Sequence, residues 1–263
     1  MAQIRNNAEV TMVKTTELAA RQRIRKALLL LSLLLFPITL YYFSPALIIQ
    51  GAAAGVVNGS FIVFGLMFVS ALFVGRLWCG WACPAGALQE LAGPINDRRV
   101  PRRRLDWIKW VIWFPWVALI AVMAVRAGGY RAVDPFFQID GGLTVLQTDP
   151  PWFIVYYLII ALFLGLAIAF GRRAGCHTIC WMAPFMVLGR NINNLVRWPT
   201  LRLRADEQAC IDCNRCTRDC PMSLDVNEMV HSSTMENPEC TLCGTCVDTC
   251  PGDVIRYTFS GGE

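Results

Sequence analysis

Eight cysteines near the C-terminal end of the chain form two runs with the same spacing. Each run reads C-x2-C-x2-C-x3-C-P, the first from Cys210 and the second from Cys240. Three thiolates spaced this closely bind three corners of one iron–sulfur cube, and the fourth, followed by proline, binds the other cube. The predicted ligands are Cys210, Cys213, Cys216 and Cys250 for cluster I, and Cys240, Cys243, Cys246 and Cys220 for cluster II.

Zinc sites and disulfides are the alternative uses of these eight cysteines. A proline after each run, Pro221 and Pro251, favours clusters over both alternatives. The paired runs are typical of a small α+β domain of the two-cluster bacterial ferredoxin type. The sequence therefore predicts two 4Fe-4S clusters as cofactors.

Four further cysteines form two C-x3-C pairs, Cys79/Cys83 and Cys176/Cys180, each shortly after a Gly-Arg step. In a helix, residues i and i+4 share one face, so each pair could bind one metal ion or one edge of a cluster. Each pair also ends a predicted two-helix hairpin. Parallel repeats related by an axis normal to the membrane would bring all four thiols together at the cytoplasmic edge.

Three interpretations of these four cysteines stay open. They could hold a third iron–sulfur centre, bind zinc or act as redox-active thiols, or pack unligated as small apolar side chains. His177, inside the second pair, is a hydrogen-bonding neighbour, a ligand, or a proton donor to a quinone. Arg76 and Arg172 precede the two pairs and would offset thiolate charge or extend to lipid headgroups.

The composition indicates which elements position these cysteines. Hydrophobic residues make up 55% of the 263 residues and charged residues only 16%, too apolar for an ordinary soluble domain. Charge-poor stretches of about 20 residues predict membrane-spanning helices. The predicted spans are 27–47, 59–75, 107–125 and 152–170. The expected fold is an all-α membrane domain of four transmembrane helices in two repeated hairpins, followed by the ferredoxin domain. A cleaved signal peptide is the alternative for the first apolar run, which is longer than such signals use.

Basic residues predict the orientation in the membrane. Six basic residues precede the first span, seven lie from Arg76 to Lys109 and nine lie from Arg172 onward. The loop between the first and second spans has no basic residue, and the loop between the third and fourth spans has two. The chain is therefore expected to be a multi-pass protein of the inner (cytoplasmic) membrane with both termini in the cytoplasm, where thiols stay reduced. From Asp206 to Glu263 there are eleven acidic and three basic residues, which argues against a nucleic-acid partner.

Four domains follow from these patterns. They are a cytoplasmic N-terminal segment (1–26), a transmembrane domain with both C-x3-C pairs (27–185), an interfacial linker (186–204) and the cytoplasmic ferredoxin domain (205–263). The linker mixes apolar and basic residues, as helices that lie on a leaflet do.

The stretch Gly75-Arg76-x-x-Cys79-Gly80-Trp81-x-Cys83-Pro84, followed by further spans and the double cysteine tail, resembles the NapH-type membrane ferredoxins. These are related to CcoG-like and NosR-like membrane iron–sulfur proteins, and the resemblance covers residues 27–257. It implies two 4Fe-4S clusters on the eight tail cysteines and electron exchange with quinone or a partner subunit. The sequence departs from the family after Cys180, where proline is delayed to Pro184, and this leaves the physiological partner open.

The expected function is that of an electron-transfer subunit of an oxidoreductase complex. It would pass electrons between a cytoplasmic donor or acceptor, such as a soluble ferredoxin or flavoprotein, and the quinone pool or a partner membrane redox subunit. Alternatives are a copper reductase that assembles a membrane oxidase, and a non-catalytic membrane anchor that wires a partner enzyme. No catalytic residue is assigned.

A quinone would need an apolar slot with one or two polar anchors. Candidate anchors are Trp78, Trp81, His177 and Trp181 near the inner face, and Asp134, Gln138 and Asp140 near the outer face. An aromatic belt and a loop turn explain the same residues without a ligand.

Overall fold

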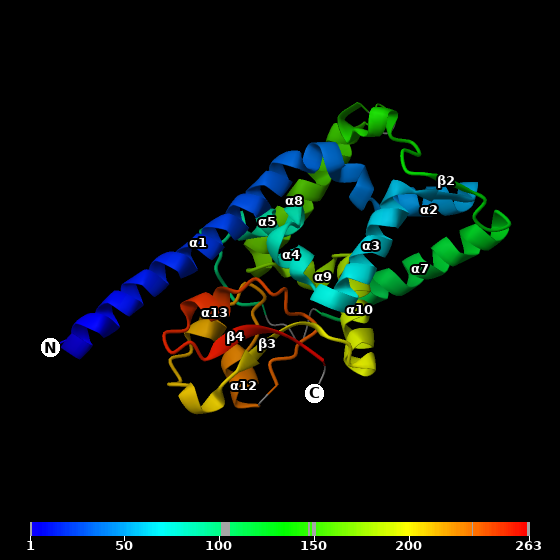
Figure 1. The fold of residues 1–263 in the computed structure, drawn as a ribbon. Helices are drawn as coiled ribbons and strands as arrows, with labels where there is room; N and C mark the ends of the chain where they lie inside the picture. The colour runs from blue at the N-terminus through cyan, green and yellow to red at the C-terminus, as the bar shows by residue number, and fades with distance from the viewer. Residues whose placement is uncertain (1, 101–105, 147, 149–150, 233, 262–263) are drawn as a thin grey trace.

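The computed structural model describes residues 2–100, 106–146, 148, 151–232 and 234–261, with side chains from residue 20 onward. The fold is mostly helical, with a small C-terminal unit packed beneath the long helices (Figure 1). The first part contains α1 (Ala2–Thr39), η1 (Leu40–Phe43), α2 (Pro45–Ala54), β1 (Val56–Asn58), α3 (Gly59–Val74), α4 (Leu77–Trp81), α5 (Pro84–Leu91), α7 (Ile108–Arg126), β2 (Ala132–Asp134), η2 (Asp140–Gly142), η3 (Thr144–Leu146), α8 (Trp152–Phe170), α9 (Ala174–Thr178) and α10 (Ala183–Val196). The C-terminal unit contains β3 (Thr200–Ala205), η4 (Glu207–Ala209), α11 (Arg215–Arg218), α12 (Val226–His231), α13 (Thr245–Thr249) and β4 (Ile255–Ser260).

Three stretches among the described residues are long and apolar enough to cross a membrane: Ala20–Ala54, Ile108–Arg126 and Trp152–Phe170. The last two are α7 and α8, and they coincide within a residue or two with the predicted spans 107–125 and 152–170. Helix α3 takes the place of the predicted span 59–75 but has only 16 residues, fewer than the ~20 that a ~30 Å apolar core requires. A four-span topology therefore stays a prediction.

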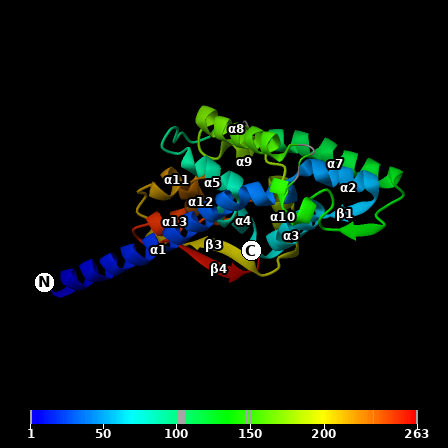
Figure 2. The ribbon, with the colours of Figure 1, turned by 90° about the horizontal axis from the view of Figure 1, so that it is seen from above.

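The first apolar run is divided differently from the expected helix over 27–47. Helix α1 ends at Thr39, and a 3-10 turn leads to Ser44, whose side chain accepts a hydrogen bond from the Leu47 amide. Pro45 then starts α2, because proline fits the first helical turn, where its missing N–H would have no partner in the helix. Helix α2 packs against α7, and β1 pairs in parallel with β2 at the same end (Figure 2).

The predicted linker 186–204 contains two different elements. Helix α10 packs closely on α3, since a Cβ on Gly189 would lie 2.8 Å from the Cβ of Ala71. Residues 200–204 belong to β3, which pairs antiparallel with β4 in the register Arg202 to Thr258. The linker thus joins the two parts of the chain through packing and a sheet.

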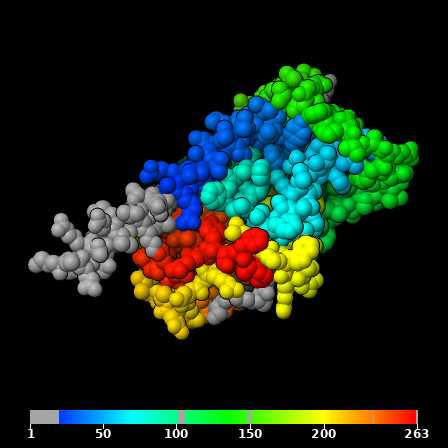
Figure 3. Space-filling view, viewed as in Figure 1, coloured from blue at the N-terminus to red at the C-terminus, as the bar shows by residue number. Residues whose placement is uncertain are grey.

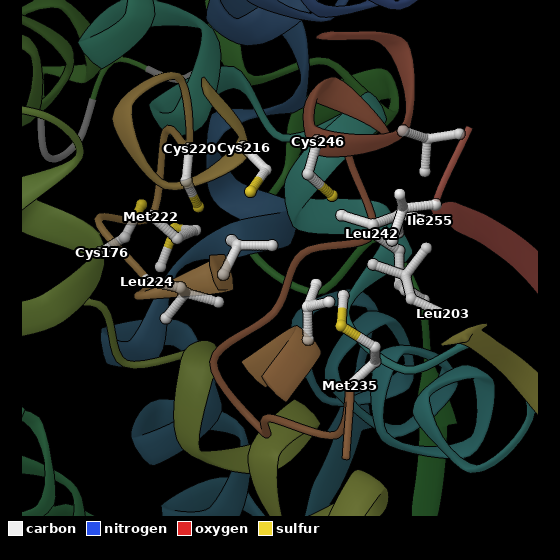
Figure 4. Packing of buried hydrophobic residues seen from close by; sticks show 14 residues of the cluster. Cys176, Leu203, Cys216, Cys220, Met222, Leu224, Met235, Leu242, Cys246 and Ile255 are labelled. Atoms are coloured by element: carbon white, nitrogen blue, oxygen red, sulfur yellow. The ribbon is translucent and has the colours of Figure 1, made fainter. Parts of the chain in front are cut away.

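The C-terminal unit has its own core of buried residues, drawn from β3, β4 and the segments between them. Figure 4 shows this cluster, which includes Leu203, Met222, Leu224 and Ile255. Cys176 of helix α9 lies at one edge of the same cluster and is buried there. The space-filling view shows the unit in direct contact with α1 and α4 (Figure 3). The packing of the tail is therefore continuous with that of the second C-x3-C pair.

Candidate metal centres

The two tail cysteine runs fold into loops of the same conformation. Three non-helical positions in each run have positive φ, 30 residues apart: Asp212, Asn214 and Ser223 (53°, 57° and 54°), and Leu242, Gly244 and Asp253 (49°, 78° and 53°). Left-handed residues next to right-handed ones turn successive backbone N–H groups toward one concavity, an arrangement found around anions and iron–sulfur sites. The sequence repeat is thus also a repeat of backbone geometry.

Each loop borders a pocket lined by four cysteines. One pocket is lined by Cys210, Cys213, Cys216 and Cys250. The other is lined by Cys220, Cys240, Cys243 and Cys246. These groupings coincide with the ligand sets expected for clusters I and II, including the exchange of the fourth cysteine. All twelve cysteines are unbridged, so none of them is used in a disulfide.

Three of the four thiols of the second group resist ionisation on their own. Burial raises the pKa of Cys240 to about 12 and that of Cys220 to about 11. Burial and repulsion from the other cysteines raise the pKa of Cys246 still more strongly. Such thiols become thiolates when a cationic centre compensates their charge, so the donor set fits an iron–sulfur cluster.

The C-x3-C pairs lie at helix ends. Cys79 is in α4 and Cys83 caps the start of α5, while Cys176 is in α9 and Cys180 lies between α9 and α10. Each pair is therefore one short helical turn followed by a break, and the continuous helix assumed for the i, i+4 argument is absent from both. All four thiols are buried, with exposed fractions of 3–6%.

The four thiols also interact electrostatically. Burial raises the pKa of Cys83, and repulsion from Cys79, Cys176 and Cys180 raises it further. The thiols of the two pairs therefore lie near one another, while the two-hairpin repeat stays a prediction. The sulfur of Met186 lies 3.4 Å from that of Cys79, which adds a soft sulfur contact on the α10 side.

Two buried arginines flank this quartet. Burial opposes the charge of Arg76, but attraction to Glu239 and to Cys79, Cys176 and Cys180 raises its pKa overall. Arg173 pairs with Glu90 and donates a hydrogen bond of 2.8 Å to the Cys79 carbonyl. Both arginines are only 1% exposed, so their charges act within the protein.

Arg172, the expected partner of the second pair, points elsewhere. It pairs with Asp97 and donates to the Arg218 carbonyl in the tail. Its neighbour Arg173 therefore has the role expected of Arg172. The double arginine in the sequence was the only available sign of this exchange.

A second charged group lies beside Arg76. Glu239, next to Cys240, pairs with both Arg76 and the fully buried Lys109. His177 is also fully buried, with its Nδ1 2.6 Å from an Asp106 oxygen, so it has the hydrogen-bonding role predicted as one alternative. Asp106, His177 and Glu239 are close enough to hold a metal ion, but Lys109 already pairs with both carboxylates, and Arg76 pairs with Glu239 as well.

The first C-x3-C pair and the cluster II loop are interlocked. A Cβ on Gly80 would lie 2.3 Å from the Thr241 carbonyl oxygen and 3.4 Å from the Cα of Cys243. The Trp81 indole donates to the Leu242 carbonyl at 3.0 Å. From α1, Gln22 donates to the Cys243 carbonyl at 3.2 Å. The residues between Cys79 and Cys83 thus touch the residues between Cys240 and Cys243.

The expected quinone anchors are mostly engaged elsewhere. The Trp81 indole N–H is used as just described, the Trp181 N–H donates to the Phe43 carbonyl at 3.1 Å, and His177 bonds Asp106. On the other face, Asp134 accepts from the Phe136 amide within its own turn. Trp78 stacks at a tilt against Phe43, with ring centroids 6.1 Å apart.

Comparison with known proteins places two stretches of the chain in iron–sulfur families. Residues 57–104, which contain Cys79 and Cys83, match a family described as a 4Fe-4S binding domain. Residues 209–255, which contain all eight tail cysteines, match a family described as a 4Fe-4S dicluster domain. The chain therefore combines two stretches that match 4Fe-4S families with helices apolar enough to cross a membrane.

Several curated proteins are similar over most of this chain. YccM of Escherichia coli, which its name assigns provisionally to electron transport, is 25% identical over 78% of the chain and 57% of its own length. The nitrogen fixation protein FixG of Rhizobium meliloti is 29% identical over 72% of the chain and 39% of its own length. The methylamine utilization ferredoxin-type protein MauN of Methylorubrum extorquens is 26% identical over 82% of the chain and 74% of its own length.

The chain thus spans little more than half of YccM and well under half of FixG. No solved structure matches.

Proposed function

We propose that this chain is a membrane-bound iron–sulfur electron-transfer subunit that connects a cytoplasmic electron carrier with the quinone pool or a partner membrane redox subunit. The observation that carries the proposal is the contact between Gly80 and the Thr241 backbone. It joins the first C-x3-C pair directly to the loop of cluster II. Electrons could therefore pass between the tail and the membrane part without crossing a solvent gap.

The proposed ligands are those predicted from the spacing. Cluster I takes Cys210, Cys213, Cys216 and Cys250, and cluster II takes Cys240, Cys243, Cys246 and Cys220. When bound, such clusters supply one-electron chemistry, with a potential set by hydrogen bonds to sulfur, burial and charge. The protein supplies the loops whose backbone N–H groups point into one concavity, the cysteine-lined pockets and the buried arginines around them.

We also propose a third iron–sulfur centre on Cys79, Cys83, Cys176 and Cys180. Among the described residues, no three cysteine sulfurs lie within 4.8 Å of one another. A single zinc ion with Zn–S bonds of about 2.3 Å would hold its sulfurs about 3.8 Å apart. The wider spacing favours a cluster over zinc, and the match over residues 57–104 supports it.

The rest of the proposal follows the resemblance to NapH-type membrane ferredoxins. The domains are those expected from the sequence, with both termini in the cytoplasm and the tail on the inner side of the inner membrane. A soluble ferredoxin or flavoprotein is the proposed carrier. Similarity to MauN and FixG, whose names refer to ferredoxin-type and nitrogen-fixation proteins, supports a role beside partner redox subunits.

Removing one thiol from each C-x3-C pair should lower the iron content without disturbing the tail. Two 4Fe-4S clusters account for about eight irons per chain, and the parent protein should contain more. Cys79→Ser and Cys176→Ser should each lose the iron above about eight per chain and keep the iron of the two tail clusters. The measurement is the iron and sulfide content per purified chain. Cys213→Ser, on the exposed side of the tail, is the control that should lose tail iron instead. Unchanged iron content and spectra in both inner variants would end the proposal of a third centre.

Reoxidation of the reduced protein tests the function itself. Purified protein reduced with dithionite should regain its oxidised cluster absorbance when a quinone analogue is added. Reoxidation by cupric ion alone would indicate a copper reductase instead. Reoxidation by neither the quinone analogue nor cupric ion would indicate a membrane anchor whose clusters only pass electrons to a partner enzyme.

A further inference from the structure

A cavity of about 590 Å³ lies where α1, α5 and the C-terminal unit meet. This volume is within the range of pockets that hold organic cofactors and other small ligands. It is bordered by none of the seven residues predicted as quinone anchors. The cavity is therefore a separate candidate for a ligand site in the part of the chain that the structure describes.

One side of the cavity is apolar and lies at the boundary of the predicted membrane region. Leu29 and Leu30 lie just after Lys26, the last charged residue before the apolar run of α1. Leu30 and Leu91, on α1 and α5, are 49% and 59% exposed. Exposed leucines at this level contact lipid when the helix crosses a bilayer, so this side can admit an apolar chain from the membrane.

The opposite side is polar and built from buried side chains. Arg25, Gln89 and Arg173 line the cavity and are 1–3% exposed. Arg25 holds both oxygens of Glu90 at 2.9 Å, and Arg173 pairs with the same carboxylate. Burial alone would raise the pKa of Glu90, but the two guanidinium groups lower it below its usual value. The Nε of Arg173 has no hydrogen-bond partner among the described residues, so one buried donor is available.

The same cavity is lined by residues that adjoin both groups of cysteines. The Gln89 amide donates to the Cys176 sulfur at 3.2 Å. On the tail side the lining includes Pro221, which follows Cys220, and Thr245, which lies between Cys243 and Cys246. A molecule in the cavity would therefore lie between the proposed third centre and cluster II.

The charges of the lining distinguish between possible ligands. Four basic residues (Arg25, Lys26, Arg172 and Arg173) face three acidic ones (Glu90, Asp97 and Asp219). Both buried arginines pair with the same carboxylate, Glu90, and the lining as a whole has one positive charge in excess. A nearly balanced lining suits an uncharged ring with hydrogen-bond acceptors better than an anionic headgroup, which needs unpaired cations.

We infer that this cavity binds the head group of a membrane quinone, whose apolar tail leaves between Leu30 and Leu91. The inference rests on the proposed function and gives it a location. Conversion of a quinone to its quinol takes two electrons and two protons. Clusters held by the neighbouring cysteines would supply the electrons one at a time when bound, and the water-exposed rim at Asp97 is the route for the protons. The reverse reaction uses the same paths.

The test uses the full-length holoprotein in detergent, with 2-heptyl-4-hydroxyquinoline N-oxide as the probe and titration calorimetry as the measurement. Leu91→Trp narrows the apolar opening, and Ala87→Phe fills the cavity from α5. We expect each to weaken binding by about tenfold or more, because the added side chain takes up space that the probe needs and the probe cannot overlap with it. Leu66→Trp, at a 62% exposed position on α3 outside the cavity, is the matched control and should bind like the parent. Iron content is measured in every variant to show that each one has folded.

The outcomes separate the site from the function. Normal binding by both cavity variants, with reoxidation of the parent by quinone, would overturn this site and leave the proposed function standing. No binding and no reoxidation in the parent would overturn both. Displacement of the probe by phosphatidylglycerol, but not by phosphatidylcholine, would show that the cavity holds an anionic lipid headgroup instead.

Discussion

Glu239→Gln should release the C-terminal unit from the helical part of the chain. Glu239 is the shared partner of Arg76 and Lys109, each only 1% exposed. Removing one partner of a buried ion pair typically costs about 3–5 kcal/mol, because the remaining charges stay buried without compensation. Thermal unfolding of the purified protein and protease protection of the tail measure this loss.

The ionisation of Glu239 fixes the pH range of the effect. Burial opposes its charge, but Arg76 and Lys109 hold the pKa of Glu239 at about 2, below its ordinary 4.5. A lowered pKa contributes stability that is complete above the unfolded value and is lost as the pH falls from about 4.5 toward 2. The difference between variant and parent should therefore be the same at pH 6 and pH 8.

An exposed ion pair across the same interface provides the control. Arg99 and Asp225 join the two parts at 2.6 Å, with side chains 39% and 61% exposed. Asp225→Asn should cost less than about 1 kcal/mol, as exposed pairs do. Equal stability of Glu239→Gln and Asp225→Asn would contradict the role assigned to Glu239.

Gly80→Ala should separate the first C-x3-C pair from the cluster II loop. The added methyl would lie 2.3 Å from the Thr241 carbonyl oxygen and 3.3 Å from its carbon, and both are backbone atoms that cannot rotate away. Overpacking of this kind costs about 1–3 kcal/mol or shifts the backbone. We expect a lower unfolding temperature and slower reoxidation of the tail clusters by quinone, with unchanged iron content.

Two other glycines give matched controls. Gly65 and Gly165 lie in α3 and α8, and a Cβ at either would meet nothing within 4 Å. Alanine there should be neutral or stabilising by up to about 1 kcal/mol, because it favours the helix more than glycine does. If Gly80→Ala behaved like these two, the contact at Thr241 would not be the route between the two parts.

The cysteine loops were predictable because their geometry is local. Spacing within each run places the thiols, and the repeated positive φ at Asp212 and Leu242 follows from the same short loop. Helices α7 and α8 were predictable from length and lack of charge. Hydropathy treats this apolar run as uniform, so the predicted helix 27–47 crosses the break between α1, which ends at Thr39, and α2, which starts at Pro45.

The docking of the two parts was not predictable from the sequence. In the sequence, Glu239 cannot be told apart from the other acidic residues of the tail. Its partner Arg76 is 163 positions away, so no local pattern links the two. Gly80 lies in a motif, but its contact with Thr241 depends on how two separately folded segments meet. The quinone anchors proposed from sequence were aromatic residues beside the cysteines, and the structure uses several of their polar atoms to hold the fold.

The position of Cys176 has a consequence for how the protein is made. Its side chain lies at the edge of the tail's own apolar core and is 5% exposed. With the tail packed in this way, the Cys176 thiol is almost closed to solvent. Any centre that this thiol helps to hold must therefore be inserted while the last 60 or so residues are still open or still emerging from the ribosome. The helical part would then acquire its centre first, and the C-terminal unit would pack over Cys176 last.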